Sequence, residues 1–214
     1  MKNIAIYTFS FCLLLMTKNL NAQSKSEQLL NEVSAKMSGF ENMYIKFNYV
    51  LENKEVDMIQ EASGSVYTQG EKYHLEFMDN IFLYDSNNTY VILTEDEEIN
   101  VIDGSSEEDI LNPSKLLFFY KEGFIYQWDA LKTIDGNKIQ YIKLTPIDSQ
   151  SEASYFLLGV NNVTKIIHSI KEVGNNGTVT LFSIEEFKAN QDISKNLFIF
   201  DESKYTEQNF TINK

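Results

Sequence analysis

The stretch Asn112–Tyr126 reads NPSKLLFFYKEGFIY and decides how the rest of the chain is interpreted. Pro113 suits the first turn of a helix, because a proline there sacrifices no hydrogen bond. Apolar and aromatic residues then run without a break from Leu116 to Tyr120, and they point in every direction around a helix axis. Such a helix is either enclosed by core on all sides or lies between a core and an apolar ligand. From this stretch alone the enclosed helix is favoured.

Residues 1–22 predict an export signal. Met1-Lys2-Asn3 is positively charged, Ile4–Met16 is apolar but too short to span a bilayer, and a cleavage site ends at Ala22. Cys12 lies inside the apolar segment and is not interpreted as a lipidation cysteine. We therefore expect one exported domain over residues 23–214, cysteine-free and unanchored. Without disulfides, an ordinary hydrophobic core must stabilise it.

The charge balance limits the partners. The sequence carries 31 acidic and 18 basic residues, a net charge of −13, and contains no arginine. Such a field repels phosphate backbones and anionic lipid surfaces. We expect a monomer with no nucleic-acid partner, and any membrane contact to depend on specific docking.

Hydrophobic periodicity predicts one helix followed by a series of strands. Leu29, Leu30, Val33 and Met37 recur at helical spacing, and Ser24 with Glu27 forms a capping box, so Ser24–Met37 is expected to be helical. From Met43 the period changes to two. The predicted strands are 43–51, 62–69, 72–78, 81–84, 89–94, 99–102, 124–134, 137–146, 154–160, 163–173, 178–187 and 196–200.

Short turns between these runs imply antiparallel neighbours, with Asp135-Gly136 as a hairpin turn. The sequence has no Pro/Gly/Ser-rich linker. The expected fold class is α+β, a strongly curved antiparallel sheet or barrel rather than a doubly wound α/β fold. The N-terminal helix and the apolar helix after Pro113 are expected to cover it.

Few residues suggest catalysis. His74 and His168 alternate with apolar residues inside predicted strands, which indicates structural histidines. The acidic runs Glu95–Glu98 and Glu107–Asp109 lack EF-hand spacing and are interpreted as solvated turns. A carboxylate pair of the glycosidase type stays an open alternative, because its members can be distant in sequence. We expect no enzyme activity, no metal and no cofactor.

Aromatic residues, in contrast, are abundant at 13% of the chain. On alternating strands they would supply one apolar face of a sheet, which the apolar helix is positioned to cover. A face that is only partly filled would leave a ligand cavity. The residues expected on this face are Tyr73, Leu75, Phe77, Phe82, Tyr84, Tyr90 and Ile92.

The order of these elements resembles LolA, the periplasmic carrier of outer-membrane lipoproteins, over nearly the whole mature chain. The similar segments, each weak alone, are Gly64-Ser65-Val66-Tyr67, the strands around Tyr84-Asp85-Ser86 and Thr89–Leu93, the Asn112-Pro113 helix, IQYIKLTP at Ile139–Pro146, Ile166 to Lys171, and NLFIFD at Asn196–Asp201.

This resemblance implies a half-open antiparallel β-barrel whose apolar interior shelters lipoprotein acyl chains. It also implies an inner-membrane ABC lipoprotein-release complex as donor and an outer-membrane acceptor. The expected cavity and lid residues are Ile45, Phe47, Tyr49, Val66, Tyr73, Leu75, Phe77, Phe82, Tyr84, Tyr90, Ile92, Leu116, Leu117, Phe119 and Tyr120.

One departure concerns the lid. Better-known LolA-like proteins have an arginine, in a loop after the glycine-containing strand, that latches the lid helices. The matching positions here read Gln69-Gly70-Glu71, so the latch is absent or replaced, with Lys72 as the nearest cation. Related folds also serve as lipid-sensing domains in envelope signalling, which is the alternative function.

Overall fold

The computed structural model describes residues 25–104 and 112–214, and only the backbone of Ser114. The predicted export signal, the cap residue Ser24 and the acidic run Glu107–Asp109 lie outside these residues. The described chain forms two compact units. The first unit comprises residues 25–38 and 120–177, and the second comprises residues 39–104, 112–119 and 178–214. Each unit is described by itself.

The first unit consists of the N-terminal helix and four antiparallel strands. Residues 25–38 are helical, and Leu29, Leu30, Val33 and Met37 are all buried, so the predicted amphipathic helix is confirmed. The strands lie in the order β10-β9-β8-β7. Their bounds are Phe124–Ile134 (β7), Asn137–Pro146 (β8), Ala153–Asn161 (β9) and Ile167–Gly174 (β10).

Local turn chemistry explains where these strands end. Asp135 and Gly136 both have positive φ, as the predicted hairpin turn requires. β10 begins four residues later than predicted, because the Asn161 side chain accepts hydrogen bonds from the backbone N–H groups of Val163 and Thr164. Those bonds close a turn that keeps residues 162–165 out of the strand. Glu32 of the helix pairs with Lys165 of this turn at 2.8 Å.

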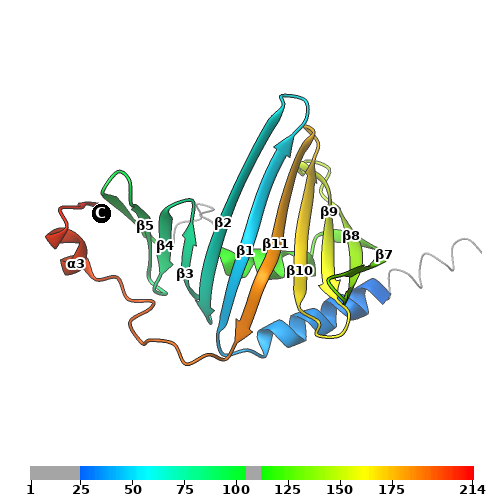
Figure 1. The fold of residues 1–214 in the computed structure, drawn as a ribbon, viewed down its shortest axis with the longest axis horizontal. Coiled ribbons are helices and arrows are strands. Elements are labelled where there is room, and N and C mark those ends of the chain that lie inside the picture. Colours follow the sequence, from blue (N-terminus) through cyan, green and yellow to red (C-terminus); the bar gives the residue numbers. More distant parts are fainter. Residues whose placement is uncertain (1–24, 105–111) are drawn as a thin grey trace, which may run out of the picture. The chain divides into compact units, whose positions relative to one another are not determined.

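The second unit contains eight strands among its described residues, in the order β12-β6-β5-β4-β3-β2-β1-β11 (Figure 1). Their bounds are Met43–Asn53 (β1), Met58–Gln69 (β2), Lys72–Phe77 (β3), Asn80–Tyr84 (β4), Asn88–Leu93 (β5), Glu98–Asp103 (β6), Thr178–Ala189 (β11) and Thr211–Asn213 (β12). All neighbours are antiparallel except β12, which pairs with β6 in parallel.

The opening stretch forms a shorter helix than the apolar run suggests. α2 spans Pro113–Phe118, the 3-10 helix η1 follows at Phe119–Lys121, and β7 takes the chain from Phe124. Asn112 caps α2 by accepting a hydrogen bond from the backbone N–H of Lys115 at 3.2 Å. Pro113 is therefore the first helical residue, as predicted.

The C-terminal region differs from the prediction. No strand forms over Asn196–Phe200, where the chain makes turns, so that prediction is wrong. A short helix follows instead at Glu202–Glu207 (α3), with Asp201 as its N-cap, and then β12. Hydrogen bonds between neighbouring turn residues, such as Leu197 N–H to Ser194 O, satisfy the backbone here without a strand partner.

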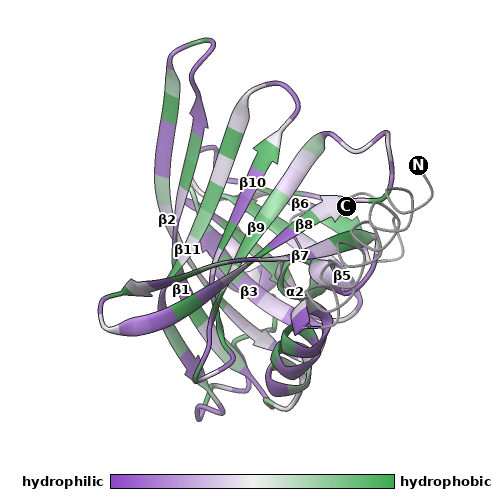
Figure 2. Ribbon diagram, turned by 90° about the vertical axis from the view of Figure 1, so that its right-hand side faces the viewer, coloured by the Kyte–Doolittle hydropathy of each residue, from purple (hydrophilic) through white to green (hydrophobic). Residues whose placement is uncertain are grey.

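The predicted α+β class, with its mainly antiparallel sheet and few helices, is confirmed. Hydrophobic and hydrophilic residues alternate along the long strands, as Figure 2 shows. This period-2 pattern made the strands predictable, because successive side chains of a strand point to opposite faces.

Candidate functional site

The register of β1 to β4 gathers most of the predicted cavity residues on one face of the second unit's sheet. Ile45 pairs with Val66, Val66 with Leu75, and Leu75 with Phe82. Directly opposed residues of antiparallel strands share a face. Tyr73 and Tyr84 also pair on this face. We call it the aromatic face; its predicted members are Ile45, Phe47, Tyr49, Val66, Tyr73, Leu75, Phe77, Phe82 and Tyr84.

Tyr90 and Ile92 lie on the opposite face, so their predicted place beside Tyr84 is wrong. Tyr90 pairs with Leu83, while Thr89 takes the position opposite Tyr84. The turn between β4 and β5 fixes this register, because the Asp85 carboxylate accepts hydrogen bonds from the backbone N–H groups of Asn87 and Asn88. β5 is apolar on both of its faces, so alternation alone does not identify the inward one.

Four rings form a closed cluster on the aromatic face. Phe47 and Tyr49 of β1 lie between Phe77 of β3 and Phe182 of β11. The ring centroids are 5.6 Å apart for Phe47–Phe77, 5.9 Å for Phe47–Phe182, 5.4 Å for Tyr49–Phe77 and 5.1 Å for Tyr49–Phe182. Tilted and edge-on pairs at these separations are favourable aromatic arrangements. We call these four residues the aromatic cluster.

Gly64 of β2 provides the space beneath this cluster. A Cβ atom at Gly64 would lie 2.6 Å from the Phe47 ring, 3.0 Å from the Phe77 ring and 2.8 Å from the backbone oxygen of Glu76. A larger residue would therefore push both rings and the β3 backbone away. The glycine of the LolA-like G-x-V-aromatic segment thus lets the rings lie directly on the sheet.

Burial changes along the aromatic face. Ile45, Val66, Tyr73 and Leu75 are buried, and burial raises the pKa of the Tyr73 hydroxyl. All four rings of the aromatic cluster keep intermediate exposure, as do Phe82 and Tyr84. The face therefore has a closed end and an end where large apolar side chains remain partly accessible.

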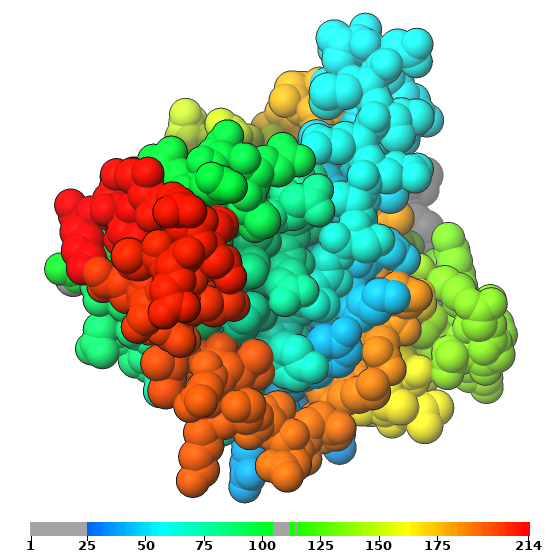
Figure 3. Space-filling view, turned by 60° about the vertical axis from the view of Figure 1, so that its left-hand side comes forward, coloured from blue at the N-terminus to red at the C-terminus, as the bar shows by residue number. Residues whose placement is uncertain are grey.

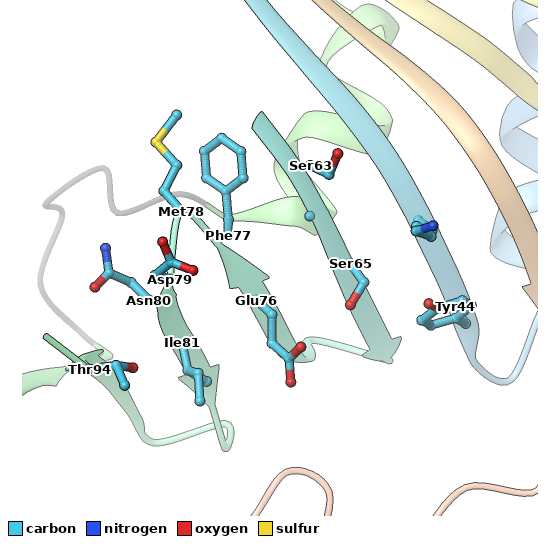
Figure 4. Close-up of a pocket in the computed structure, with 12 residues that line it drawn as sticks. Tyr44, Ser63, Ser65, Glu76, Phe77, Met78, Asp79, Asn80, Ile81 and Thr94 are labelled. Carbon is cyan, nitrogen blue, oxygen red and sulfur yellow. The ribbon is translucent and has the colours of Figure 1, made fainter. Parts of the chain in front are cut away.

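α2 lies against β2 and β3. In Figure 4, which looks onto the pocket that Ser63 and Ser65 line, a pale green helix lies behind the strands, which places α2 on the aromatic face. Leu117 is 6% exposed, whereas Leu116 is 37% exposed. α2 is therefore not enclosed on all sides, contrary to the interpretation favoured from its stretch alone.

Two further predicted lid residues follow α2. Phe119 is partly buried, and Tyr120 is fully buried in the first unit. Burial raises the pKa of the Tyr120 hydroxyl. The Tyr126 hydroxyl donates hydrogen bonds to the backbone oxygens of Tyr120 and Lys121, which fixes the end of η1 within that unit.

The opposite face of the second unit is polar beside β1 and β2. A shallow pocket of about 460 Å³ lies there, and Ser63, Ser65 and Glu76 are among its lining residues (Figure 4). On the same face Tyr44 and Tyr67 pair at 4.6 Å. Toward β5 this face becomes apolar and is covered by the C-terminal segment. We call it the covered face.

Lys72 does not replace the missing latch arginine. It pairs with Gln69 and lies on the covered face, because its neighbour Tyr73 lies on the aromatic face. α2 lies on the aromatic side. Gly70, with a φ of 59°, makes the turn between β2 and β3 that fixes this arrangement.

Sequence reasoning missed Phe182. Phe182 and Ile184 lie two residues apart in β11 and share a face, but nothing local in the sequence indicates that β11 pairs with β1. The described residues include no helix long and apolar enough to cross a membrane. Among these same residues, no group of three or more His, Cys, Asp or Glu side chains is arranged to hold a metal ion.

No protein-family model matches the chain, and no curated protein matches it. Solved structures do. An uncharacterized conserved protein from Thermus thermophilus is 9% identical, with a TM-score of 0.56, over 88% of this chain and 98% of that one. LprF from Mycobacterium bovis is 12% identical, with a TM-score of 0.51, over 80% of this chain and 97% of that one.

A LolA superfamily protein from Nitrosomonas europaea also matches, with 11% identity and a TM-score of 0.42, over 82% of this chain and 98% of that one. At these identities the comparisons concern the fold alone. The two structures with TM-scores above 0.5 agree with the α+β architecture expected from the sequence.

Proposed function

We propose that this protein is a periplasmic carrier that shelters the acyl chains of lipoproteins and moves them from the inner to the outer membrane. The observation that carries the proposal is the aromatic cluster. Its four rings sit in the interior of strands and yet remain partly accessible. Strand-interior rings that are not fully packed offer an apolar surface to a guest.

Acyl chains exposed to water carry a large free-energy cost. Each CH₂ group that leaves water gains about 0.8 kcal/mol, so a lipoprotein with several acyl chains is insoluble without cover. Rigid rings present a large apolar area and lose little conformational entropy on binding. A surface of this kind suits acyl chains of varied length, which have no polar groups to be recognised.

α2 is the proposed lid over this surface. It contacts β2 and β3 through buried Leu117, while Leu116 is left partly exposed for contact with a chain. No arginine exists to latch it, and Lys72 faces the other way. We infer that the apolar packing of Leu117 helps to keep α2 closed, so that an entering acyl chain competes with this contact of the lid.

The remaining expectations belong to the same proposal. The chain would be exported and act as a monomer without enzyme activity, metal or cofactor. Its partners would be lipoprotein acyl chains, the inner-membrane ABC lipoprotein-release complex and an outer-membrane acceptor. Its cavity would be lined by the aromatic-face residues together with Leu116, Leu117 and Phe119 of the lid.

Native mass spectrometry of the purified protein with a triacylated lipoprotein tests the proposal. We expect a soluble 1:1 complex. The double variant Phe77→Ala/Phe182→Ala should weaken it about tenfold or more, because two rings of the cluster are lost. Tyr44→Ala is the matched control, since Tyr44 belongs to an aromatic pair on the covered face. If the wild-type protein forms no complex with the lipoprotein, the proposed carrier function is wrong.

Depletion in the native host separates the carrier from the sensing alternative. A carrier predicts mislocalised lipoproteins. Normal lipoprotein sorting together with altered envelope-stress signalling would instead favour a sensing module.

A further inference from the structure

The hairpin that joins β1 and β2 ends in an exposed apolar tip, which the proposed binding surface does not include. We call Lys54–Ile59 the hairpin tip. Three large apolar side chains lie there, and they are 68% (Val56), 41% (Met58) and 64% (Ile59) exposed. β3 pairs with β2 over Gly64–Gln69, so the hairpin extends beyond β3 (Figure 1). Figure 3 shows this end of the hairpin, in cyan, projecting beyond the green strands of the same unit.

Polar residues make the turn at this tip. The Asn53 side-chain oxygen accepts a hydrogen bond from the backbone N–H of Glu55 at 3.0 Å, and its amide nitrogen donates to Thr178 Oγ1 at 3.2 Å. Asp57 has a φ of 49°, a conformation that aspartate tolerates better than a β-branched residue does. The apolar side chains are therefore not needed to close the turn. Three large apolar side chains gathered in water without such a need indicate an interaction surface.

The apolar side chains lie on different sides of the tip. Met58 pairs with Asn53 and lies on the side of the aromatic face, whereas Ile59 pairs with Glu52 and lies on the side of the covered face. Val56 lies in the turn between the two strands. A flat protein surface would contact only one side of such a tip. The fluid boundary between the head groups and the acyl chains of a membrane can surround all of it.

The tip continues the accessible end of the aromatic face. At the other end of this face, Ile45 of β1 is 3% exposed. Phe47, Tyr49 and Leu51 follow on the same face of β1 and keep intermediate exposure. Met58 at the tip is more exposed still. Exposure therefore increases along this face toward the tip, and a tip that touched a membrane would bring the accessible end of the aromatic cluster close to the lipid.

The charges near the tip limit the kind of lipid surface. Residues 52–61 contain Glu52, Glu55, Asp57 and Glu61 with a single lysine, Lys54, which gives a net charge of −3. Lys54 Nζ lies 3.6 Å from a carboxylate oxygen of Glu52. A net negative charge repels anionic head groups. The tip therefore fits a surface of zwitterionic head groups, whose ammonium groups can pair with its carboxylates.

We propose that the hairpin tip docks the protein on a lipid bilayer with zwitterionic head groups. Val56, Met58 and Ile59 enter the boundary between head groups and acyl chains, while the carboxylates of Glu55 and Asp57 remain among the head groups. This inference deepens the proposed carrier function and rests on it, because docking brings the accessible end of the aromatic face to a membrane that donates or receives acyl chains. It gives a strongly acidic protein a route to a lipid surface that does not depend on charge attraction.

A fluorophore at the tip tests the docking. The single cysteine of the chain, Cys12, lies in the predicted export signal, so a Val56→Cys variant purified after export carries one site for an environment-sensitive label. We expect vesicles of phosphatidylcholine and phosphatidylethanolamine to shift the emission to shorter wavelength, and vesicles rich in phosphatidylglycerol to shift it less. Val163→Cys, at a 79% exposed valine of the first unit, is the matched control and should show no shift. An equal or larger shift on the phosphatidylglycerol vesicles would overturn the head-group assignment.

A double variant measures how much the apolar side chains contribute. Val56→Ser/Ile59→Ser should reduce the fraction of protein that floats with the zwitterionic vesicles about tenfold, because two apolar side chains no longer leave water. Val163→Ser/Ile199→Ser replaces two other exposed side chains and should float like the wild type. Equal flotation of the test variant and the wild type would contradict the proposal. Flotation of the wild type only on vesicles that carry a membrane protein would mean that a protein, and not lipid, binds the tip.

The lipoprotein complex separates this inference from the carrier function. The double variant Val56→Ser/Ile59→Ser should still form the soluble 1:1 complex in native mass spectrometry, because the aromatic cluster is unchanged. If the wild type forms this complex but does not float with vesicles, the docking inference is wrong and the carrier function stands. If the wild type floats but forms no complex, the carrier function is wrong and the tip is a membrane-docking element of another kind of protein.

Discussion

The two faces of the sheet in the second unit are both apolar in part, but they are filled differently. On the covered face, aliphatic side chains such as Leu83, Ile92 and Ile99 are buried, and the C-terminal segment lies over part of this face. On the aromatic face, the large rings around Phe47 and Phe77 keep intermediate exposure. The C-terminal segment of the unit thus covers part of one face, and we infer that the aromatic face binds an apolar ligand.

The largest expected effect comes from truncating one buried side chain on the covered face, Leu83, and one ring of the aromatic cluster, Phe77. The two losses of stability should differ, because the two faces are packed differently. Leu83→Ala should lower the free energy of unfolding by about 2–4 kcal/mol, since it opens a cavity in closed packing. Phe77→Ala removes more atoms, but from a partly exposed ring, and should cost about 1–2 kcal/mol. Urea unfolding of the two variants measures both values. A larger cost for Phe77→Ala would mean that the aromatic face is the better packed one.

Gly64 tests whether the cluster rests directly on the sheet. Gly64→Ala should cost about 1–3 kcal/mol, because the new methyl group meets the Glu76 backbone oxygen as well as both phenylalanine rings. Its neighbour Ser65 lies on the covered face, so Ser65→Ala is the control and should have little effect. Thermal unfolding by circular dichroism compares the two, and equal melting temperatures would refute the close contact.

The ring stack on the covered face should contribute a smaller amount. Phe200→Leu keeps an apolar side chain but removes the stacked pair with Tyr90, and should cost about 1 kcal/mol. The same change should increase the rate of amide hydrogen exchange in Ser194–Tyr205 without changing it in β1 and β2. Faster exchange throughout the second unit would show that the C-terminal segment is part of the main core.

The smallest expected effect concerns α3. Asp201→Ala removes the N-cap of a six-residue helix that has no buried residues, and should cost about 0.5–1 kcal/mol. Because α3 belongs to the C-terminal segment on the covered face, away from the aromatic cluster, this variant should leave lipoprotein binding unchanged. A loss of that binding in native mass spectrometry would contradict the separation of the two faces.

Local patterns were sufficient to predict most of the strands. Turn pairs such as Asp135-Gly136 and the alternation from Met43 onward depend on neighbouring residues only. The predicted strand at Asn196–Phe200 failed for the opposite reason. Its alternating apolar residues pack onto another part of the sheet instead of pairing with it, and alternation does not distinguish these two outcomes.

The candidate site was predicted in part for the same physical reason. Period-2 alternation places Tyr73, Leu75 and Phe77 on one face, and the register confirms it. The faces of Tyr90 and Ile92 depend on a turn that shifts the register by one residue, which no single-strand pattern reveals. Phe182 joins the cluster only through a strand pairing between distant parts of the sequence.

That distant pairing also bears on how the protein is made. Two side-chain hydrogen bonds show how distant the paired segments are. Asn42, just before β1, bonds to Gln191, 149 positions away, and Asn53 of β1 bonds to Thr178 of β11, 125 positions away. β1 to β6, in contrast, form by successive hairpins. During synthesis, β1 therefore keeps an unpaired hydrogen-bonding edge until residues 178–189 have been made. Pairings of such high contact order form slowly, and an open edge invites association between chains. The newly made chain would depend most on chaperones in that interval.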